Sequence, residues 1–147
     1  GKQDISPDEI VASVNVPLKR HTHFHYWKIS KRFDQDISAV CGAFGFAIEN
    51  DTITSLRIAF GGMAATPRRA RLCEQALVGQ SVHDALLPSA GEALAQDFAP
   101  ISDMRASASY RRLAAHGLLE RCLRSLNGQT LPQLFPTAQT LQAVSHE

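Results

Sequence analysis

The sequence predicts an α+β domain, in which an antiparallel sheet of three to four strands carries about three helices packed on one face. Strand signals are confined to residues 9–60 and helix signals to residues 67–126, without the alternation that a parallel sheet requires. The chain has 147 residues, 44% of them hydrophobic, which is enough for one domain with its own core. We expect this domain at residues 9–127, a disordered leader at 1–8 and a flexible tail at 128–147.

Two strands are expected in the first part of the chain. Residues 9–17 read EIVASVNVP, where polar Asn15 separates two valines and Pro17 ends the run. Residues 22–30 place three aromatic side chains among polar neighbours, a composition that suits a half-buried strand. Residues 31–38, KRFDQDIS, have no continuous apolar face and are expected to form an exposed loop.

The strongest local signal is an antiparallel hairpin over residues 39–60. Bulky side chains occupy one parity of its first strand and small residues occupy the other. Residues 49–51, Glu-Asn-Asp, supply the turn. Because protein interiors are close-packed, we expect a helix rather than a ligand to fill the small-residue face. The residues of that face are Ala39, Cys41, Ala43, Gly45 and Ala47.

A helix is expected directly after the hairpin, over residues 67–78. Thr66 is a suitable N-cap, and Pro67 is tolerated in a first helical turn. Gly79 is typical of a helix end. The inward stripe of this helix would be Ala70, Cys73 and Leu77.

Two further helical segments complete the predicted fold. Residues 81–97 are expected to form one bent helical segment, in which Pro88 must break or restart the helix after Leu87. A long helix is expected over residues 107–126, with a surface ion pair between Glu120 and Arg124. Its buried face would consist of Tyr110, Ala114, Gly117, Leu118, Cys122 and Leu126.

Composition restricts the classes of function. The 15 basic and 14 acidic side chains leave a formal charge of +1, which argues against a dedicated nucleic-acid binder. No apolar run reaches the ~18 residues needed to cross a bilayer. The cysteines Cys41, Cys73 and Cys122 form no paired motif and are expected to be reduced. We therefore expect a soluble cytoplasmic protein without nucleic-acid or membrane partners.

Two clusters of reactive side chains are candidate sites. His21, His23 and His25 alternate along the expected strand, but same-side neighbours stand ~6.6 to 6.8 Å apart at the backbone, too wide for tight zinc ligation. A solvated histidine cluster is preferred, with an independent metal-binding protein as an alternative. Asp34 and Asp36 lie in a charged loop, where acids are usually solvated. No catalytic motif is present, so the residues alone predict no catalytic centre and no metal site.

Three stretches together resemble a known family. YWKISKRFDQDISAVCGAF, IAFGGMAATPRRA and DFAPISDMRASASYRRLAAHGLLER occur in this order. They are similar to the C-terminal part of the flavoprotein subunit of xanthine dehydrogenases. More broadly, they resemble the domain shared with the FAD-binding medium subunits of carbon monoxide dehydrogenases and related molybdenum hydroxylases. The resemblance covers about residues 9–126.

The resemblance implies a role in an oxidoreductase. Such enzymes oxidise a purine, xanthine to urate, at a molybdenum cofactor and pass electrons through iron-sulfur clusters and FAD to NAD. The main FAD-binding domain with its glycine-rich loops, the iron-sulfur domain and the molybdenum-binding subunit would be partners of this chain. The domain would cover the flavin and shape the NAD site, and would have no turnover in isolation. The alternative is a subunit-docking module without a part in catalysis.

The resemblance also implies individual cofactor contacts. Lys28, in the motif KISKR, matches a lysine that reaches the flavin ring system, and Val11 and Ala12 match backbone that touches the cofactor. An ammonium close to the flavin N1 would stabilise the negative charge of the reduced ring, because nearby charge is one of the few means by which a protein tunes a cofactor. Lys28 is therefore the principal candidate.

The segment from Lys31 to Asp36 resembles a loop beside the flavin that governs the approach of NAD. Asp34 and Asp36 match this loop in acidic character, whereas Gln35 stands where other members can have an acid. Carboxylates here would oppose the effect of Lys28 on the flavin and would attract or repel parts of the nicotinamide nucleotide.

Overall fold

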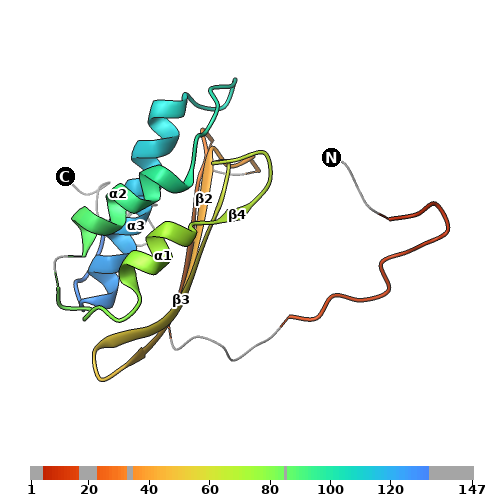
Figure 1. Cartoon of the computed structure of the whole chain (residues 1–147). Coiled ribbons are helices and arrows are strands. Elements are labelled where there is room, and N and C mark those ends of the chain that lie inside the picture. Colours follow the sequence, from red (N-terminus) through yellow and green to blue (C-terminus); the bar gives the residue numbers. More distant parts are fainter. Residues whose placement is uncertain (1–4, 17–22, 33–34, 85, 133–147) are drawn as a thin grey trace, which may run out of the picture.

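The computed structural model describes residues 5–16, 23–32, 35–84 and 86–132. In these ranges four strands precede three helices along the chain (Figure 1), as the sequence predicts. The strands are β1 (His23–Ile29), β2 (Val40–Glu49), β3 (Thr52–Gly61) and β4 (Arg68–Arg69). The helices are α1 (Arg71–Leu77), α2 (Leu87–Asp97) and α3 (Ala108–Leu126).

The strands form one antiparallel sheet in the order β1-β2-β3-β4. β2 and β3 meet at a tight turn, in which Asn50 and Asp51 have positive φ angles of 49° and 60°. Two successive residues of this conformation make the turn geometry that suits the twist of a hairpin. The register shifts between Ala47 and Ile48, which marks a bulge. The predicted hairpin over residues 39–60 is confirmed.

All three helices lie on one face of the sheet (Figure 1), so the predicted α+β class is confirmed. They cover the bulky parity of β2, where Phe44 and Phe46 are fully buried in one core with Leu119 of α3. The expectation that a helix fills the small-residue face is wrong. Burial stabilises by about 25 cal/mol per Å² of apolar surface, so the helices pack where the larger side chains are.

The strand expected at residues 9–17 is not formed over residues 9–16, the part of it that the structure describes. Residues 9–16 contain no strand and are exposed throughout, and Figure 1 shows residues 5–16 extending away from the sheet. A strand needs a neighbour that satisfies its N–H and C=O groups. The described part of the chain offers residues 9–16 no such neighbour.

Helix α1 starts four residues later than predicted, at Arg71 instead of Pro67. Two of the intervening residues, Arg68 and Arg69, pair with β3 as β4. The Asp97 carboxylate at the end of α2 accepts hydrogen bonds from the N–H groups of Leu72, at 3.0 Å, and Cys73, at 2.9 Å. These donors belong to the first turn of the helix and otherwise lack partners, so a residue distant in sequence replaces a local cap. The predicted inward stripe of this helix is fully buried.

The later helices differ from prediction in detail. Residues 81–84 and 86 are not helical, and α2 begins at Leu87 with Pro88 in its first turn. The single bent segment is therefore wrong, whereas the restart of a helix at Pro88 is confirmed. α3 begins one residue after the predicted start. Its buried face is shifted from the predicted one, leaving Tyr110 and Gly117 exposed. The buried residues are Arg111, Ala115, Leu118, Leu119 and Cys122.

The cysteines are free thiols, as expected from the sequence. Cys73 and Cys122 are buried in the core, and Cys41 is half-buried. Burial raises the pKa of Cys73 to about 12 and also raises the pKa of Cys122. No helix in the described part of the chain is long and apolar enough to cross a membrane.

Candidate functional site

The sheet face opposite the helices, called the open face below, carries long side chains on β1 beside small ones on β2. Phe24, Tyr26 and Lys28 are exposed. The register sets Tyr26 opposite Ala43 and Lys28 opposite Cys41. Because side chains alternate between the two faces of a strand, these five residues share one face. The open face therefore has a flat surface of small side chains on β2, called the floor below, with two aromatic rings and one ammonium group along its β1 edge.

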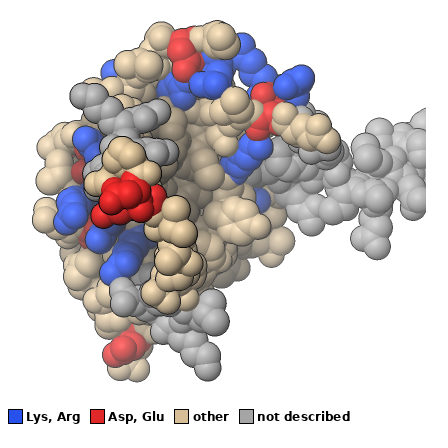
Figure 2. Space-filling model, turned by 90° about the vertical axis from the view of Figure 1, so that its right-hand side faces the viewer, with Lys and Arg blue, Asp and Glu red and all other residues tan. Residues whose placement is uncertain are grey.

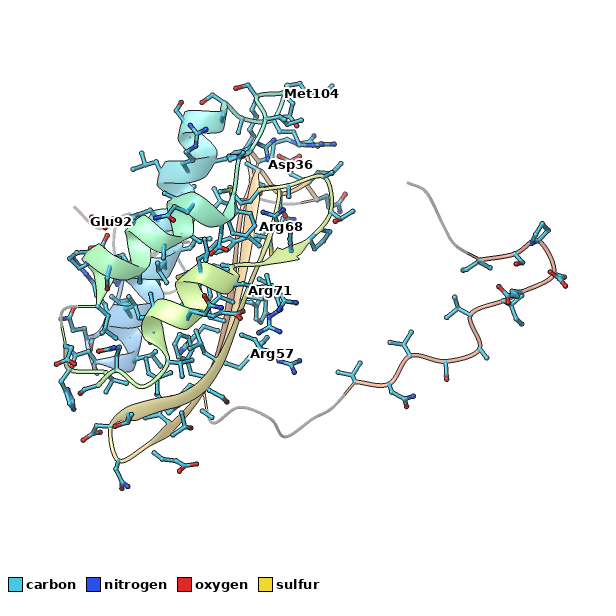
Figure 3. All side chains as sticks on the ribbon, viewed as in Figure 1. Asp36, Arg57, Arg68, Arg71, Glu92 and Met104 are labelled. Atoms are coloured by element: carbon cyan, nitrogen blue, oxygen red, sulfur yellow. The ribbon has the colours of Figure 1, made fainter. Side chains whose placement is uncertain are left out.

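Strand β3 extends this floor and adds a cation. Ala59 lies opposite Ala43, and Gly61 lies opposite Cys41. A Cβ atom placed on Gly61 would meet only the Cβ of Cys41, at 3.8 Å, so the floor has free space at this end. Figure 3 shows Arg57 projecting on the side away from the helices. Figure 2 views this side and shows both basic and acidic side chains around a largely uncharged centre.

The loop of residues 31–38 follows Lys28 at one end of the sheet, and Asp36 holds its described part together. One carboxylate oxygen of Asp36 accepts the N–H of Arg32 at 2.9 Å, and the other accepts the N–H of Ile37 at 2.9 Å. The Arg32 guanidinium lies 3.7 Å from the same carboxylate. The hydrogen bond from the Arg32 backbone is the main reason that the pKa of Asp36 is lowered. Asp36 is thus engaged by its own loop.

The hydrogen-bonded conformation of this loop is expected to depend on pH. The folded-state pKa of Asp36 lies below its usual value of 3.8, so the carboxylate stabilises the loop at all pH values above that and loses this effect as pH falls through the folded-state pKa. The amide proton shifts of Arg32 and Ile37 should therefore titrate together, with a midpoint below 3.8. A midpoint at or above 3.8 would contradict the proposal that the Asp36 carboxylate stabilises the loop. Asp36→Ala should abolish the shared titration.

Two basic side chains attach this loop to the segment before α3. The Lys31 ammonium donates to the backbone carbonyl of Met104 at 2.7 Å. Arg111 donates to the carbonyl of Ala39 at 2.5 Å and to the Asp103 carboxylate at 2.6 Å. Figure 3 shows Met104 and Asp36 at the same end of the molecule. Hydrogen bonds therefore connect the loop to residues 101–111 at its start, through Lys31, and just beyond its end, through Ala39.

A cavity of about 310 Å³ opens between these segments. Its polar groups are positioned by Arg111, which also donates to the carbonyl of Gly62 at 2.9 Å and is only 3% exposed. The Asp103 carboxylate receives the N–H groups of Arg105 and Ala106, and these bonds are the main reason that the pKa of Asp103 is lowered. The cavity walls include Ile37, Gly62, Thr66, Asp103, Arg105 and Arg111.

The predicted cofactor contacts are only partly brought together. Lys28, Lys31 and Asp36 lie in or beside the loop at one end of the sheet. Val11 and Ala12 lie in the exposed segment that extends away from the sheet (Figure 1). Asp34 lies outside the described residues, and its role stays a prediction.

Sequence reasoning missed the residues that hold this end of the molecule. Arg111 was not selected, because hydrophobic periodicity does not anticipate a buried cation. One signal was available in the sequence: Arg111 lies four residues before Ala115, and residues four apart share a helix face. The burial of Ala115 would therefore place Arg111 on the buried face as well. Nothing local indicated that Asp103 and Gly62 would meet it. Arg57 on the open face was also not selected, although strand alternation placed it there.

The histidine cluster is only partly described. His21 lies outside the described residues, so the predicted triad is untested. His25 stacks on Trp27 with ring centroids 5.3 Å apart, and burial, followed by the charge of His23, lowers the pKa of His25. The described residues include no group of three or more His, Cys, Asp and Glu side chains placed to bind a metal.

These features define a class of protein: an α+β domain with an exposed sheet face and an adjoining charged loop. Residues 25–126 match the family model of the CO dehydrogenase flavoprotein C-terminal domain. The chain belongs to this family, which confirms the resemblance drawn from its three sequence motifs.

The relatives are longer proteins. The chain is 33% identical over 113 residues to the putative xanthine dehydrogenase FAD-binding subunit of Escherichia coli K12, covering 76% of this chain and 39% of that protein. It is also 33% identical to the xanthine dehydrogenase of Emericella nidulans, covering 80% of this chain and 9% of that protein. A solved carbon monoxide dehydrogenase from Hydrogenophaga pseudoflava, which lacks the Mo-pyranopterin moiety, aligns with a TM-score of 0.62 at 26% identity, covering 67% of this chain and 34% of that chain.

Proposed function

We propose that this chain is the C-terminal domain of the FAD-binding part of a xanthine dehydrogenase, where its open face covers the flavin and its 31–38 loop shapes the NAD site. The parent enzyme would oxidise xanthine to urate at a molybdenum cofactor and pass electrons through iron-sulfur clusters and FAD to NAD. Two relatives named as xanthine dehydrogenase or its FAD-binding subunit, each 33% identical, support this proposal. The main FAD-binding domain, the iron-sulfur domain and the molybdenum-binding subunit would be its partners.

The observation that carries the proposal is the position of Lys28 on the open face. Its side chain is exposed and stands opposite Cys41, beside a floor of small residues. A flat ring can approach the part of this face formed by Cys41, Ala43, Ala59 and Gly61 closely, since these residues carry no large side chain. The residues present therefore fit one side of a flavin, with its main pocket supplied by another domain. When bound, FAD supplies electron-transfer chemistry, and Lys28 supplies a positive charge beside the ring.

The loop would act mainly through its shape. The Asp36 carboxylate already accepts two backbone N–H groups, so its charge is directed into the loop. Lys31 is likewise engaged by the carbonyl of Met104. We propose that these contacts keep the loop in a fixed position where NAD approaches. Val11 and Ala12 would contact the cofactor through their backbone.

Replacing Lys28 by Met in the complete enzyme should make its flavin harder to reduce. Removal of a positive charge beside the ring destabilises the reduced form of the flavin. A destabilisation of about 1.4 kcal/mol corresponds to roughly 30 mV for a two-electron couple. We therefore expect the flavin potential to shift by about 30 mV or more in the negative direction. Redox titration of the bound flavin measures it. Arg57→Met removes a cation from the same face four residues further along the β2 register and should shift the potential less. An unchanged potential in Lys28→Met would contradict the proposal.

A second candidate function is a docking module that joins the FAD-binding part to its partners. Three exposed apolar side chains, Met104, Tyr110 and Leu113, lie near the start of α3 beside Arg105 and Arg112. Aromatic, methionine and arginine side chains are enriched in protein interfaces.

One assay separates the two functions. Enzyme carrying Lys28→Met or Asp36→Asn should form NADH more slowly while electron transfer from purine to an artificial dye stays normal, if the domain serves the flavin and the NAD site. Failure of the subunits to assemble would favour the docking module instead.

A further inference from the structure

We infer that residues 9–16 are a β-strand that completes the sheet of the domain preceding the family-matched region in the longer protein. The segment reads EIVASVNV. Ile10, Ala12, Val14 and Val16 fall on one parity, and the other parity is mostly polar. Alternation of this kind gives a strand with one face for a core and one for solvent. The segment therefore carries the pattern of a half-buried strand.

In the structure, the apolar side chains of this segment are not packed into a core. Ile10 is 88% exposed, Val14 is 78% exposed and Val16 is 71% exposed. A turn comes directly before them, in which the N–H of Glu9 donates to the carbonyl of Ser6 at 3.0 Å. After that turn, the backbone of residues 10–16 forms no hydrogen bond within the described chain. Contiguous apolar side chains with unpaired backbone mark an interaction surface.

The neighbouring sheet of this domain does not use the segment. β1 is an edge strand with one side free of pairing among the described strands. The six residues 17–22 that separate the segment from β1 would permit a return hairpin, since connections of that length are common. Residues 5–16 instead extend away from the sheet (Figure 1). The partner is thus sought outside residues 25–126.

The match with relatives indicates which partner this is. The family model starts at residue 25, after the segment, and describes a C-terminal domain. The chain covers only 39% of the Escherichia coli relative and 34% of the solved carbon monoxide dehydrogenase chain. A strand placed just before a C-terminal domain follows directly on the preceding part of the polypeptide, and consecutive elements are usually adjacent in space. We therefore assign residues 9–16 to an open edge of the sheet in that preceding domain.

This arrangement has a consequence for the position of the open face. With residues 9–16 fixed in the preceding sheet, β1 begins only seven residues later, so the two domains are held side by side at the start of β1. The inference does not depend on Lys28 meeting a flavin, because it concerns only the pairing of the segment.

Hydrogen exchange on the full-length subunit tests the inference directly. Amides of residues 10–16 should exchange at least 100-fold more slowly in the full-length subunit than in the 147-residue chain. Val14→Lys in the full-length subunit should lower the melting temperature of the preceding domain by several degrees and leave that of residues 23–132 unchanged. Ser13→Lys, on the opposite parity, is the matched control and should change neither.

Three results would overturn the inference. Equally fast exchange of residues 10–16 in both proteins would show that the segment has no partner in the subunit. Slow exchange in the 147-residue chain, at a concentration where it is a monomer, would show that the segment pairs with its own β1. Slow exchange there that appears only together with a dimer would assign it to a second copy.

Discussion

Replacing Arg111 by methionine is expected to lower the free energy of unfolding by about 3 kcal/mol or more, because two charge-assisted hydrogen bonds to backbone carbonyls are lost at about 1.5 to 3 kcal/mol each. The Arg111 guanidinium joins the start of β2 to the end of β3 through the carbonyls of Ala39 and Gly62. Methionine keeps most of the apolar length of the side chain but leaves both carbonyls without this donor. Urea unfolding of the 147-residue chain, followed by circular dichroism, measures the loss.

Arg112→Met is the matched control for this prediction. Arg112 is the next residue of α3 and is exposed, so its replacement should change stability by no more than about 0.5 kcal/mol. Equal effects of the two substitutions would show that the contacts of Arg111 do not stabilise the domain. The position of the 31–38 loop should also respond only to Arg111→Met, which the amide shifts of Arg32 and Ile37 would report.

Gly62→Ala is expected to destabilise the domain by about 2 to 5 kcal/mol, from a left-handed backbone that costs ~1 to 2 kcal/mol and from overpacking that costs ~1 to 3 kcal/mol. Gly62 has a φ angle of 81°. A Cβ atom there would clash with the backbone carbonyl of Ala39 and come within 2.9 Å of the Arg111 guanidinium. The carbonyl belongs to the backbone beside β2, so it cannot move aside at small cost.

Gly79→Ala separates the two contributions. Gly79 has nearly the same φ angle, 82°, but a Cβ atom there has no neighbour within 4 Å. Its replacement should therefore cost only the backbone contribution of ~1 to 2 kcal/mol. Thermal unfolding of both variants under the same conditions measures the difference. If Gly79→Ala were as damaging as Gly62→Ala, the crowding around Gly62 would have no energetic effect.

The sheet was the most predictable part of the fold, because its signals are local. The alternation in residues 39–48 identifies β2, and the Asn50-Asp51 turn identifies its partner. The start of α1 was not predictable in this way. Thr66 and Pro67 are a sound local helix start, but β4 pairs with β3 and Asp97 caps the helix from 25 residues further along the chain. Such distant contacts leave no trace in a sequence window.

The candidate site was predictable to the extent that it depends on strand parity. Strand alternation accounts for the position of Lys28 on the same face as the small residues of β2. Its exposure was not predictable, because the sequence favoured a helix on that face. The state of Asp36 was not predictable either, since an acid in a charged loop looks solvated until its two backbone partners are seen. Helix α3 shows the same limit. Its apolar pattern suggested that the buried face contains Tyr110. The buried face instead contains Arg111, whose hydrogen bond to the carbonyl of Ala39 directs this side of the helix toward the sheet.

The distribution of thiols gives this domain its own chemical reporters. Cys73 and Cys122 are buried and have raised pKa values, so they will resist alkylation until the core opens. Cys41 stands instead on the floor of the open face, half-accessible to a maleimide. Its labelling rate in the free domain, compared with that in the assembled enzyme, would measure how completely a neighbour shields the sheet, while the two inner thiols would record global unfolding in the same sample.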